Sequence, residues 1–298
     1  MRDLTYNDYK RMVEDNLLNY IPEIDQKSIT IYESMKYSLL AGGKRLRPVL
    51  LLASCEFAGT ECETAVPYAC AIEFIHTYSL IHDDLPCMDD DDLRRGVPTN
   101  HKVYGEAIAT LAGDGLLNSA VEIMNLDKLM FFDDFDMIKR RISASYEIVT
   151  AAGCRGMIAG QVADIEAEDR NCSREMLDYI HNTKTAALII GAVRAGARIG
   201  GADEDVLEDL TLYAENLGLA FQVADDILDV TGDEEIMGKK TGSDESSQKA
   251  TYPSLYGLDE SRKRLTLLTD QAKEALAKYY DNAEFFVKVA DELETRCK

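Results

Sequence analysis

The sequence has 298 residues, 46% of them hydrophobic and 29% charged, which is typical of a soluble globular protein. Its 54 acidic residues outnumber its 32 basic residues, and the formal net charge of −22 argues against nucleic acid or an anionic membrane as the main partner. The seven cysteines contain no CxxC pair, so neither a disulfide framework nor a zinc site is expected.

Apolar residues recur at helical spacing along almost the whole chain, and strand-like alternation is almost absent. In chain order, this pattern predicts helices over residues 4–20, 28–41, 48–58, 64–84, 105–126, 134–152, 154–168, 173–199, 204–231, 259–279 and 284–296. Glycine-containing breaks separate many of them, and no Pro/Ser-rich linker divides the chain. We therefore expect one all-α domain spanning residues 1–298.

The chain carries no expected targeting or membrane segment. The N-terminal MRDLTYNDYK lacks the apolar core of a signal peptide. The uncharged run over residues 185–193 is far too short to span a bilayer. We expect a soluble, cytoplasmic protein without a membrane span.

The helix predicted over residues 64–84 runs into an acidic cluster, SLIHDDLPCMDDDDLRRG at 79–96. Pro86 disfavours helical geometry at Leu85, so the chain should turn there and bring Asp89 back alongside Asp83. Carboxylates at a helix C-terminus are opposed by the helix dipole by a few tenths to ~1 kcal/mol each. Selection for stability alone would not place them there.

A second acidic cluster, DDILD at 225–229, comes late in the helix predicted over 204–231. Asp225 and Asp226 lie four and three residues before Asp229, so the carboxylates share one helix face. Hard oxygen ligands of this kind select Mg²⁺ or Ca²⁺. An EF-hand starting at Asp89 does not fit, because its twelfth position is Asn100 instead of Glu. The alternative is two unrelated solvated patches.

The scarce basic residues gather beside glycines or in loops, in GGKRLRP at 42–48, RRG at 94–96, and at Lys239, Lys240 and Lys249. Lys184 opens an apolar helix segment, where an unpaired ammonium would be costly to bury. Mg²⁺ is commonly held by carboxylates together with substrate phosphates, and arginine suits phosphate oxygens. Because neither GxxxxGK[ST] nor GxGxxG occurs, the combination predicts a diphosphate site and no nucleotide site. For each cation alone, a surface salt bridge is the alternative.

These motifs resemble the trans-isoprenyl diphosphate synthases (polyprenyl synthetases), in particular the bacterial farnesyl diphosphate synthase type. The matching stretches follow the family order over about two-thirds of the chain: GGKRLRP at 42–48, IHTYSLIHDDLPCMDDDDLRRG at 75–96, PTNHKVYGEAIATLAGD at 98–114, GQVADIEAED at 160–169, TKTAALI at 183–189, FQVADDILDVTGD at 221–233, and GKKTGSD with KATYP at 238–253. The resemblance implies the isoprenoid synthase fold, a helical bundle around a central substrate cavity, and a homodimer.

The resemblance also implies Mg²⁺-dependent, head-to-tail condensation of isopentenyl diphosphate with an allylic diphosphate (dimethylallyl or geranyl), giving farnesyl diphosphate and pyrophosphate. The metal ligands carried over by position are Asp83, Asp84, Asp89, Asp225, Asp226 and Asp229, for three Mg²⁺ ions, with Mn²⁺ as an alternative. The allylic diphosphate is expected on Arg94, Lys184, Lys239 and Lys249, and that of isopentenyl diphosphate on Lys44, Arg47, His76 and Arg95. Thr185 and Gln222 are expected to face the carbocation, with Gln161 and Asp164 supporting the site. The residues expected to act directly in catalysis are Asp83, Asp84, Arg94, Lys184, Thr185, Gln222 and Asp225.

Product length is expected to depend on Tyr78, which precedes Asp83 by five residues, about 7.5 Å along the helix. In the family, a bulky ring here is the floor that stops elongation, which favours a farnesyl product. A geranylgeranyl diphosphate synthase, a class I terpene cyclase and a non-catalytic helical subunit are the alternatives. DDILD and GKRLRP disfavour a cyclase, and intact aspartate motifs disfavour a non-catalytic subunit. Asp90, Asp91 and Asp92 are expected to form a solvated loop.

Overall fold

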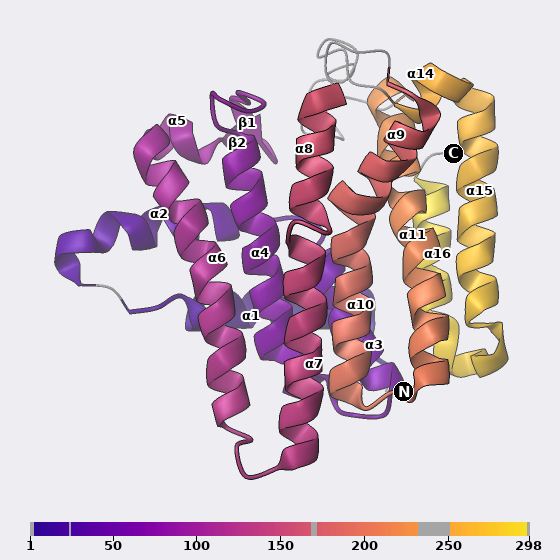
Figure 1. The fold of residues 1–298 in the computed structure, drawn as a ribbon, viewed down its shortest axis with the longest axis horizontal. Coiled ribbons are helices and arrows are strands. Elements are labelled where there is room, and N and C mark those ends of the chain that lie inside the picture. Colours follow the sequence, from indigo (N-terminus) through magenta and orange to yellow (C-terminus); the bar gives the residue numbers. More distant parts are fainter. Residues whose placement is uncertain (1–2, 24, 168–171, 232–250, 297–298) are drawn as a thin grey trace.

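The computed structural model describes residues 3–23, 25–167, 172–231 and 251–296, and these ranges are almost entirely helical, as the sequence predicts. Long helices run side by side in one bundle (Figure 1). They are α4 (Val66–Asp83), α6 (Glu106–Leu129), α7 (Phe135–Ala152), α8 (Met157–Ala167), α10 (Ala187–Gly200), α11 (Glu204–Thr231) and α15 (Leu258–Ala275). The other elements include α1 (Tyr6–Asn16), η1 (Leu17–Tyr20), η2 (Gln26–Ser28), α2 (Ile29–Leu39), α3 (Leu46–Phe57), η3 (Cys62–Ala65), α5 (Asn100–Tyr104), α9 (Arg174–Ile180), η4 (His181–Ala186), α14 (Tyr252–Tyr256), η5 (Ala277–Ala283) and α16 (Glu284–Thr295).

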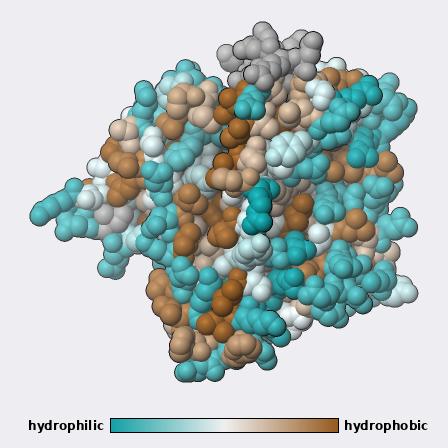
Figure 2. Space-filling model, in the orientation of Figure 1, coloured by the Kyte–Doolittle hydropathy of each residue, from teal (hydrophilic) through white to brown (hydrophobic). Residues whose placement is uncertain are grey.

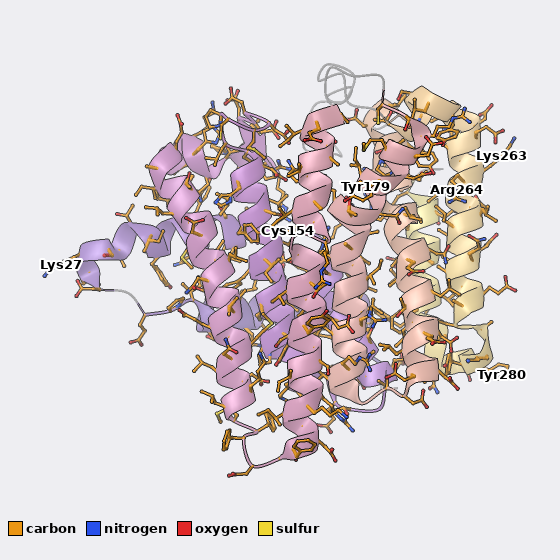
Figure 3. All side chains as sticks on the ribbon, viewed as in Figure 1. Lys27, Cys154, Tyr179, Lys263, Arg264 and Tyr280 are labelled. Atoms are coloured by element: carbon orange, nitrogen blue, oxygen red, sulfur yellow. The ribbon has the colours of Figure 1, made fainter. Side chains whose placement is uncertain are left out.

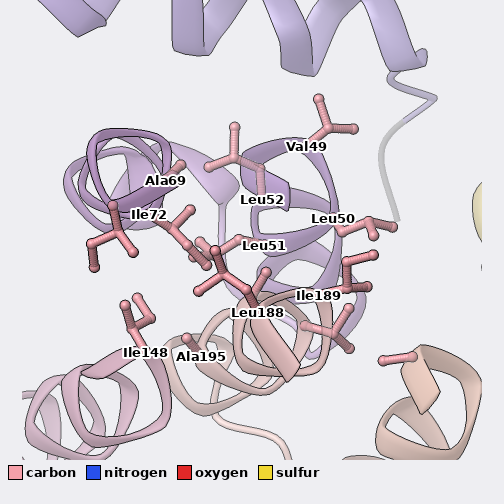
Figure 4. Packing of buried hydrophobic residues seen from close by; sticks show 14 of the residues in the cluster. Val49, Leu50, Leu51, Leu52, Ala69, Ile72, Ile148, Leu188, Ile189 and Ala195 are labelled. Atoms are coloured by element: carbon pink, nitrogen blue, oxygen red, sulfur yellow. The ribbon is translucent and has the colours of Figure 1, made fainter. Parts of the chain in front are cut away.

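The centre of the core lies where α3 packs on α10. Figure 4 shows Leu51 of α3 close to Leu188 of α10 in the packed cluster. The two helices approach closely because α10 carries glycines at the contact. A Cβ atom on Gly196 would lie 2.0 Å from the carbonyl oxygen of Leu51, so no larger residue fits without displacing α3. The nearly all-apolar sequence of α10 is thus explained by its central position.

Three short elements in the segment after α4 were not predicted from the sequence. Strands β1 (Leu93–Arg94) and β2 (Val97–Pro98) form an antiparallel hairpin, and α5 follows it. Arg95 and Gly96 form the turn, with φ of 55° and 79°, the left-handed values that twist-matched hairpin turns require. Strands of two residues are too short to show an alternating pattern, so only the break near Arg95 was predictable.

The helix predicted over residues 173–199 is divided in the structure. It consists of α9, a π-helical turn η4 and α10. Single π-helical turns often occur at functional sites, and this one contains Lys184 and Thr185. A hydrophobic periodicity does not distinguish a π-helical turn from an α-helix, so the sequence predicted one continuous helix.

One face of the bundle exposes many apolar side chains. Figure 2 shows apolar patches on the side of the molecule where α6, α7 and α8 lie. The exposed residues on these helices are Leu111, Val121, Leu126, Leu129, Phe135, Ile142, Tyr146, Val149, Ile158, Val162 and Ile165. Cys154 is exposed at the break between α7 and α8 (Figure 3). In the part of the chain that the structure describes, none of the helices is both long and apolar enough to cross a membrane.

Candidate functional site

The first acidic cluster lies at the end of α4, where the chain turns back as the sequence predicts. Asp83 is the last residue of α4. After Pro86, the backbone N–H of Asp89 donates a hydrogen bond to the carbonyl oxygen of Asp83 at 2.9 Å. The N–H of Met88 donates to the carbonyl of Leu85 at 2.8 Å and closes the turn. Asp89 therefore lies beside Asp83, although six positions separate them in the sequence.

Asp84 differs from its neighbours because it is buried and already paired. Its carboxylate accepts hydrogen bonds from Arg94 Nε, at 2.8 Å, and from Arg94 Nη2. Arg94 Nη2 also donates to Asp91 at 3.1 Å. Burial raises the pKa of the Asp84 carboxyl, while the Arg94 guanidinium acts in the opposite direction. Arg94, predicted to bind the allylic diphosphate, is here held in place by Asp84.

The surroundings of Asp83 disfavour its charged form. Burial raises its pKa from 3.8 to about 6, and the like charge of Asp89 adds to the shift. The positive charges of Lys184 and Arg94 act against it. A carboxylate in this environment favours binding of a proton or a cation. The electrostatic effect of Lys184 also shows that the turn η4 lies near the end of α4.

Lys184 is positioned by a close approach between α8 and η4. Gly160 of α8 lies directly against the backbone of η4, and a Cβ there would be 2.2 Å from the backbone nitrogen of Lys184. The Lys184 ammonium donates to Asp164 at 2.5 Å. This contact supports the predicted auxiliary position of Asp164. Gln161, its predicted companion, is partly buried on α8.

The second acidic cluster lies on α11, and its members have different surroundings. Asp226 is 3% exposed and Asp229 is 2% exposed. Both oxygens of Asp226 accept hydrogen bonds, one from Gln222 Nε2 at 2.8 Å and one from the backbone N–H of Tyr252 at 2.9 Å. Asp225 is more accessible than either. Of the three carboxylates, Asp225 is thus the one most open to an incoming ligand.

Gln222 connects the second cluster to η4. Its Oε1 accepts a hydrogen bond of 2.8 Å from the Thr185 hydroxyl, while its amide donates to Asp226. The two residues expected to face a carbocation are therefore neighbours, 37 positions apart in the sequence. Tyr252, which anchors Asp226 through its backbone, was not singled out by the sequence analysis. A backbone donor leaves no side-chain signal.

Four predicted cationic or imidazole residues lie at the opposite side of the site. Arg47 Nη1 lies 3.4 Å from His76 Nε2. Burial lowers the pKa of Arg47 to about 10, and the negative charges of Glu73 and Asp225 oppose this shift. Burial and neighbouring arginines, with Arg47 and Arg95 the strongest, lower the pKa of His76 well below its usual value. Positive charges crowded in this way favour an anionic ligand.

The glycine-rich loop before α3 meets the β1–β2 hairpin. Arg95 donates to the carbonyl oxygen of Gly42, and a Cβ on Gly43 would lie 2.7 Å from Arg95 Cζ. Gly43 has a φ of +127°, which also excludes most side chains. The Lys44 ammonium lies 5.7 Å from the ring centroid of Phe221 on α11. The loop thus contacts Arg95 of the hairpin and brings Lys44 to the side of α11.

One buried ion pair near the site was missed by the sequence analysis. Arg45, a member of the basic stretch GGKRLRP without a predicted ligand role, is 4% exposed and pairs with Glu73 of α4 at 2.5 Å. Its Nη2 also donates to the carbonyl of Leu39 at 2.6 Å. Arg45 has a φ of 57°, an uncommon left-handed value for a residue with a side chain. The sequence feature that could have indicated this ion pair is Glu73, an acidic residue within the otherwise apolar α4.

Asp90, Asp91 and Asp92 lie in an exposed loop, as expected, with side chains 59%, 49% and 80% exposed, but each of them also faces a cation. Asp92 forms an ion pair with Lys102 of α5 at 2.7 Å, and Asp90 lies 3.7 Å from the same ammonium. Asp91 accepts from Arg94. These exposed ion pairs add weak contacts between the loop, the hairpin and α5.

The donor set fits a divalent cation that is completed by a ligand. Across residues 3–23, 25–167, 172–231 and 251–296, no group of three or more His, Cys, Asp or Glu side chains encloses a metal position. Asp83, Asp89 and Asp225 offer only oxygen donors, which suit Mg²⁺ held by one or two carboxylates plus phosphate oxygens. Lys239 and Lys249, both predicted to bind diphosphate, lie outside the described residues.

Comparisons with known proteins agree on one family. The polyprenyl synthetase family matches residues 29–284. A farnesyl diphosphate synthase of Bacillus subtilis is 47% identical over 266 residues, covering 89% of this chain and 88% of that protein. A geranylgeranyl diphosphate synthase of Cyanophora paradoxa is 46% identical over 291 residues, covering 97% and 94%. The crystal structure of an FPP/GFPP synthase from Zymomonas mobilis superposes with a TM-score of 0.83 at 34% identity, covering 97% of this chain and 100% of that one.

Proposed function

The chain belongs to the polyprenyl synthetase family and is a prenyltransferase, and from this premise we propose that it condenses isopentenyl diphosphate with dimethylallyl or geranyl diphosphate. The proposed products are farnesyl diphosphate and pyrophosphate. One observation supports this proposal: the turn η4 connects the two acidic clusters, because Lys184 acts electrostatically on Asp83 of α4 while Thr185 donates a hydrogen bond to Gln222 of α11. Arg47 acts in turn on Asp225 of the second cluster. Such a set of charges matches two diphosphates and their metal ions.

We propose that Asp83 and Asp89 on one side and Asp225 on the other hold Mg²⁺. Bound there, Mg²⁺ supplies positive charge to the diphosphate that leaves the allylic carbon. Asp226 is proposed to orient Gln222 and the backbone of Tyr252, because it accepts hydrogen bonds from both. Three ions, and Mg²⁺ in preference to Mn²⁺, are part of this proposal.

Lys184 and Arg94 are proposed to bind the allylic diphosphate. Both are held by carboxylates, Asp164 and Asp84, which orient them before substrate arrives. When the allylic C–O bond breaks, negative charge grows on the leaving diphosphate, and fixed cations stabilise it without rearranging. Lys239 and Lys249 are proposed for the same group from their motif positions alone.

Thr185 and Gln222 are proposed to face the positive charge that remains on the allylic carbon. Their hydrogen bond brings the hydroxyl oxygen of Thr185 and the amide oxygen of Gln222 together. Both are polar oxygen atoms that can face a positive charge, and neither is a strong nucleophile. The terminal alkene carbon of isopentenyl diphosphate then forms the new C–C bond to this carbon. This leaves the positive charge on the internal carbon of the former double bond. The CH₂ group next to that carbon, on the diphosphate side, loses a proton to the departing pyrophosphate and a new double bond forms, so the site needs no separate basic side chain.

The diphosphate of isopentenyl diphosphate is proposed to bind to Arg47, Arg95, His76 and Lys44. Burial disfavours the charged form of Arg47, so an anion would relieve part of its desolvation cost. With its low pKa, His76 contributes a neutral imidazole to this group. This second anion site distinguishes a synthase from a terpene cyclase, which needs only one.

Turnover assays test the proposed reaction directly. Purified protein with Mg²⁺ should consume isopentenyl diphosphate together with dimethylallyl or geranyl diphosphate and release pyrophosphate. Asp83→Ala and Asp225→Ala should reduce turnover by several orders of magnitude, whereas Asp133→Ala, an exposed carboxylate in the α6–α7 connection, should not. Cyclisation of an allylic diphosphate without isopentenyl diphosphate would favour a terpene cyclase instead. Near-normal rates in either site variant would refute the metal assignment.

We propose that Tyr78 limits the product to fifteen carbons. Tyr78 is 6% exposed on α4, and burial and then the charge of Asp83 raise the pKa of its hydroxyl. The ring therefore lies inside the bundle, close enough to the first acidic cluster to interact with the charge of Asp83. Tyr78→Ala should shift the products towards longer chains, measured by chromatography of the dephosphorylated alcohols. An unchanged product would contradict the assignment and leave the geranylgeranyl alternative open.

A second copy of the chain is proposed to cover the apolar face of α6, α7 and α8. Eleven exposed apolar residues lie there, which is more than an isolated soluble surface usually leaves uncovered. Val149→Asp and Val162→Asp together should convert a dimer into monomers in sedimentation experiments. A monomeric wild-type protein would refute this proposal. Residues 1–298 are proposed to act as one cytoplasmic domain within each copy.

A further inference from the structure

We propose that His82 is a positioning residue for product length, because its imidazole holds the Tyr78 ring across the path of the growing chain. This inference rests on the proposed role of Tyr78 as the floor. His82 follows Tyr78 by four positions on α4, so the two side chains lie on the same helix face. Their ring centroids are 5.7 Å apart with an interplanar angle of 77°, the edge-to-face arrangement that aromatic pairs favour.

The other side of the imidazole is anchored to α6. His82 Nε2 lies 3.0 Å from the carbonyl oxygen of Thr110. Because a carbonyl oxygen only accepts, Nε2 carries the proton in this bond, and the ring orientation is fixed. His82 therefore spans the space between the Tyr78 ring and the backbone of α6.

The sequence of α6 provides the room for this bridge. Gly113 lies under the imidazole, and a Cβ there would be 2.1 Å from His82 Nε2. Any larger residue at position 113 would displace the ring. Asp114, the next residue, is 62% exposed and 3.9 Å from Nε2, so it adds only a weak, solvent-screened attraction.

The position of His82 explains why its loss would affect chain length. Along α4, His82 lies between Tyr78 and Asp83, so its ring stands at the level between the first acidic cluster and the Tyr78 ring that it contacts. Without the imidazole, the Tyr78 ring loses its neighbour on the α6 side and gains space to turn away. A longer chain could then pass the floor although Tyr78 itself is still present.

Two variants remove the contact in different ways. His82→Ala deletes the ring, and Gly113→Ala keeps the ring but displaces it. Each should raise the ratio of C20 to C15 product by roughly two- to tenfold, the range expected for loss of one aromatic pair. Asp114→Asn, the matched control, should leave the ratio unchanged. Thermal unfolding and circular dichroism identify a variant that fails to fold. If His82→Ala or Gly113→Ala fails in this way, the product ratio of the remaining variant tests the proposal.

The double variant separates this inference from the floor assignment. If His82 acts through Tyr78, adding His82→Ala to Tyr78→Ala should not lengthen the products further. If Tyr78→Ala alone leaves C15 unchanged, the floor assignment fails. If Tyr78→Ala lengthens the products but neither His82→Ala nor Gly113→Ala does, the floor stands and the positioning role is overturned. Additive lengthening in the double variant would also overturn it.

Discussion

Replacing Asp83 by asparagine should stabilise the metal-free protein while it abolishes turnover. The reason is the cost of keeping a charged carboxylate at the end of α4. Burial and the charge of Asp89 raise the Asp83 pKa from 3.8 to about 6, against the attraction of Lys184. At pH values above about 6, a pKa shift of this size lowers the free energy of unfolding by about 3 kcal/mol. Asparagine has nearly the same shape and carries no charge, so it avoids that cost.

The pH dependence of the difference follows from proton linkage. A carboxyl whose folded pKa lies above its unfolded pKa destabilises the fold increasingly as pH rises from 3.8 to about 6. The stability gain of Asp83→Asn should therefore be near zero at pH 4 and complete above pH 6. At pH 8 the gain should raise the midpoint of thermal unfolding by on the order of 5–10 °C.

The measurement is thermal unfolding in the presence of a chelator, at several pH values, for wild type and Asp83→Asn. Asp133→Asn makes the same chemical change at an exposed site and should leave the midpoint unchanged. Addition of Mg²⁺ with inorganic pyrophosphate should stabilise the wild type more than Asp83→Asn, because ligands that bind only the folded state raise its stability. A variant less stable than wild type at pH 8, or a gain independent of pH, would refute the reasoning.

Two further substitutions probe the packing that holds the site. Gly160→Ala should cost about 1–3 kcal/mol and lower turnover, because its Cβ would displace the backbone of Lys184. Glu166→Ala, at an exposed position of the same helix, should do neither, and an equally active Gly160→Ala protein would contradict this account. Glu73→Gln should cost up to about 3–5 kcal/mol in denaturant unfolding, since it removes the buried partner of Arg45 and leaves only Glu14, 40% exposed and 3.5 Å from Arg45 Nε. A loss below about 1 kcal/mol would show that the pair is unimportant.

The sequence predicted the parts of the site that depend on local rules. Pro86 specifies the turn that brings Asp89 beside Asp83, because a proline disfavours helix at the preceding residue. The three- and four-residue spacings place the carboxylates of α11 on one face. Helical periodicity located the long helices, including α11 with its observed ends, Glu204 and Thr231.

Local rules did not determine the π-helical turn η4 or the hairpin after Asp92. The first depends on the close approach of Gly160 to Lys184, which a sequence pattern does not encode. The second depends on contacts within the folded segment, such as the hydrogen bond from the Thr99 hydroxyl to the carbonyl oxygen of Asp91, which a hydrophobic pattern does not predict. Both features decide where cations meet the acidic clusters.

By itself, the sequence determined which residues are charged, which helices form and which carboxylates share a face, because these follow from spacing along one chain segment. Only the tertiary structure decided which charges are available. It buried Arg45 with Glu73, gave both oxygens of Asp226 to neighbouring donors, and left Asp225 more accessible. The physical reason is that desolvation and pairing depend on which helices pack together, and neighbouring residues of one motif experience different surroundings once they do.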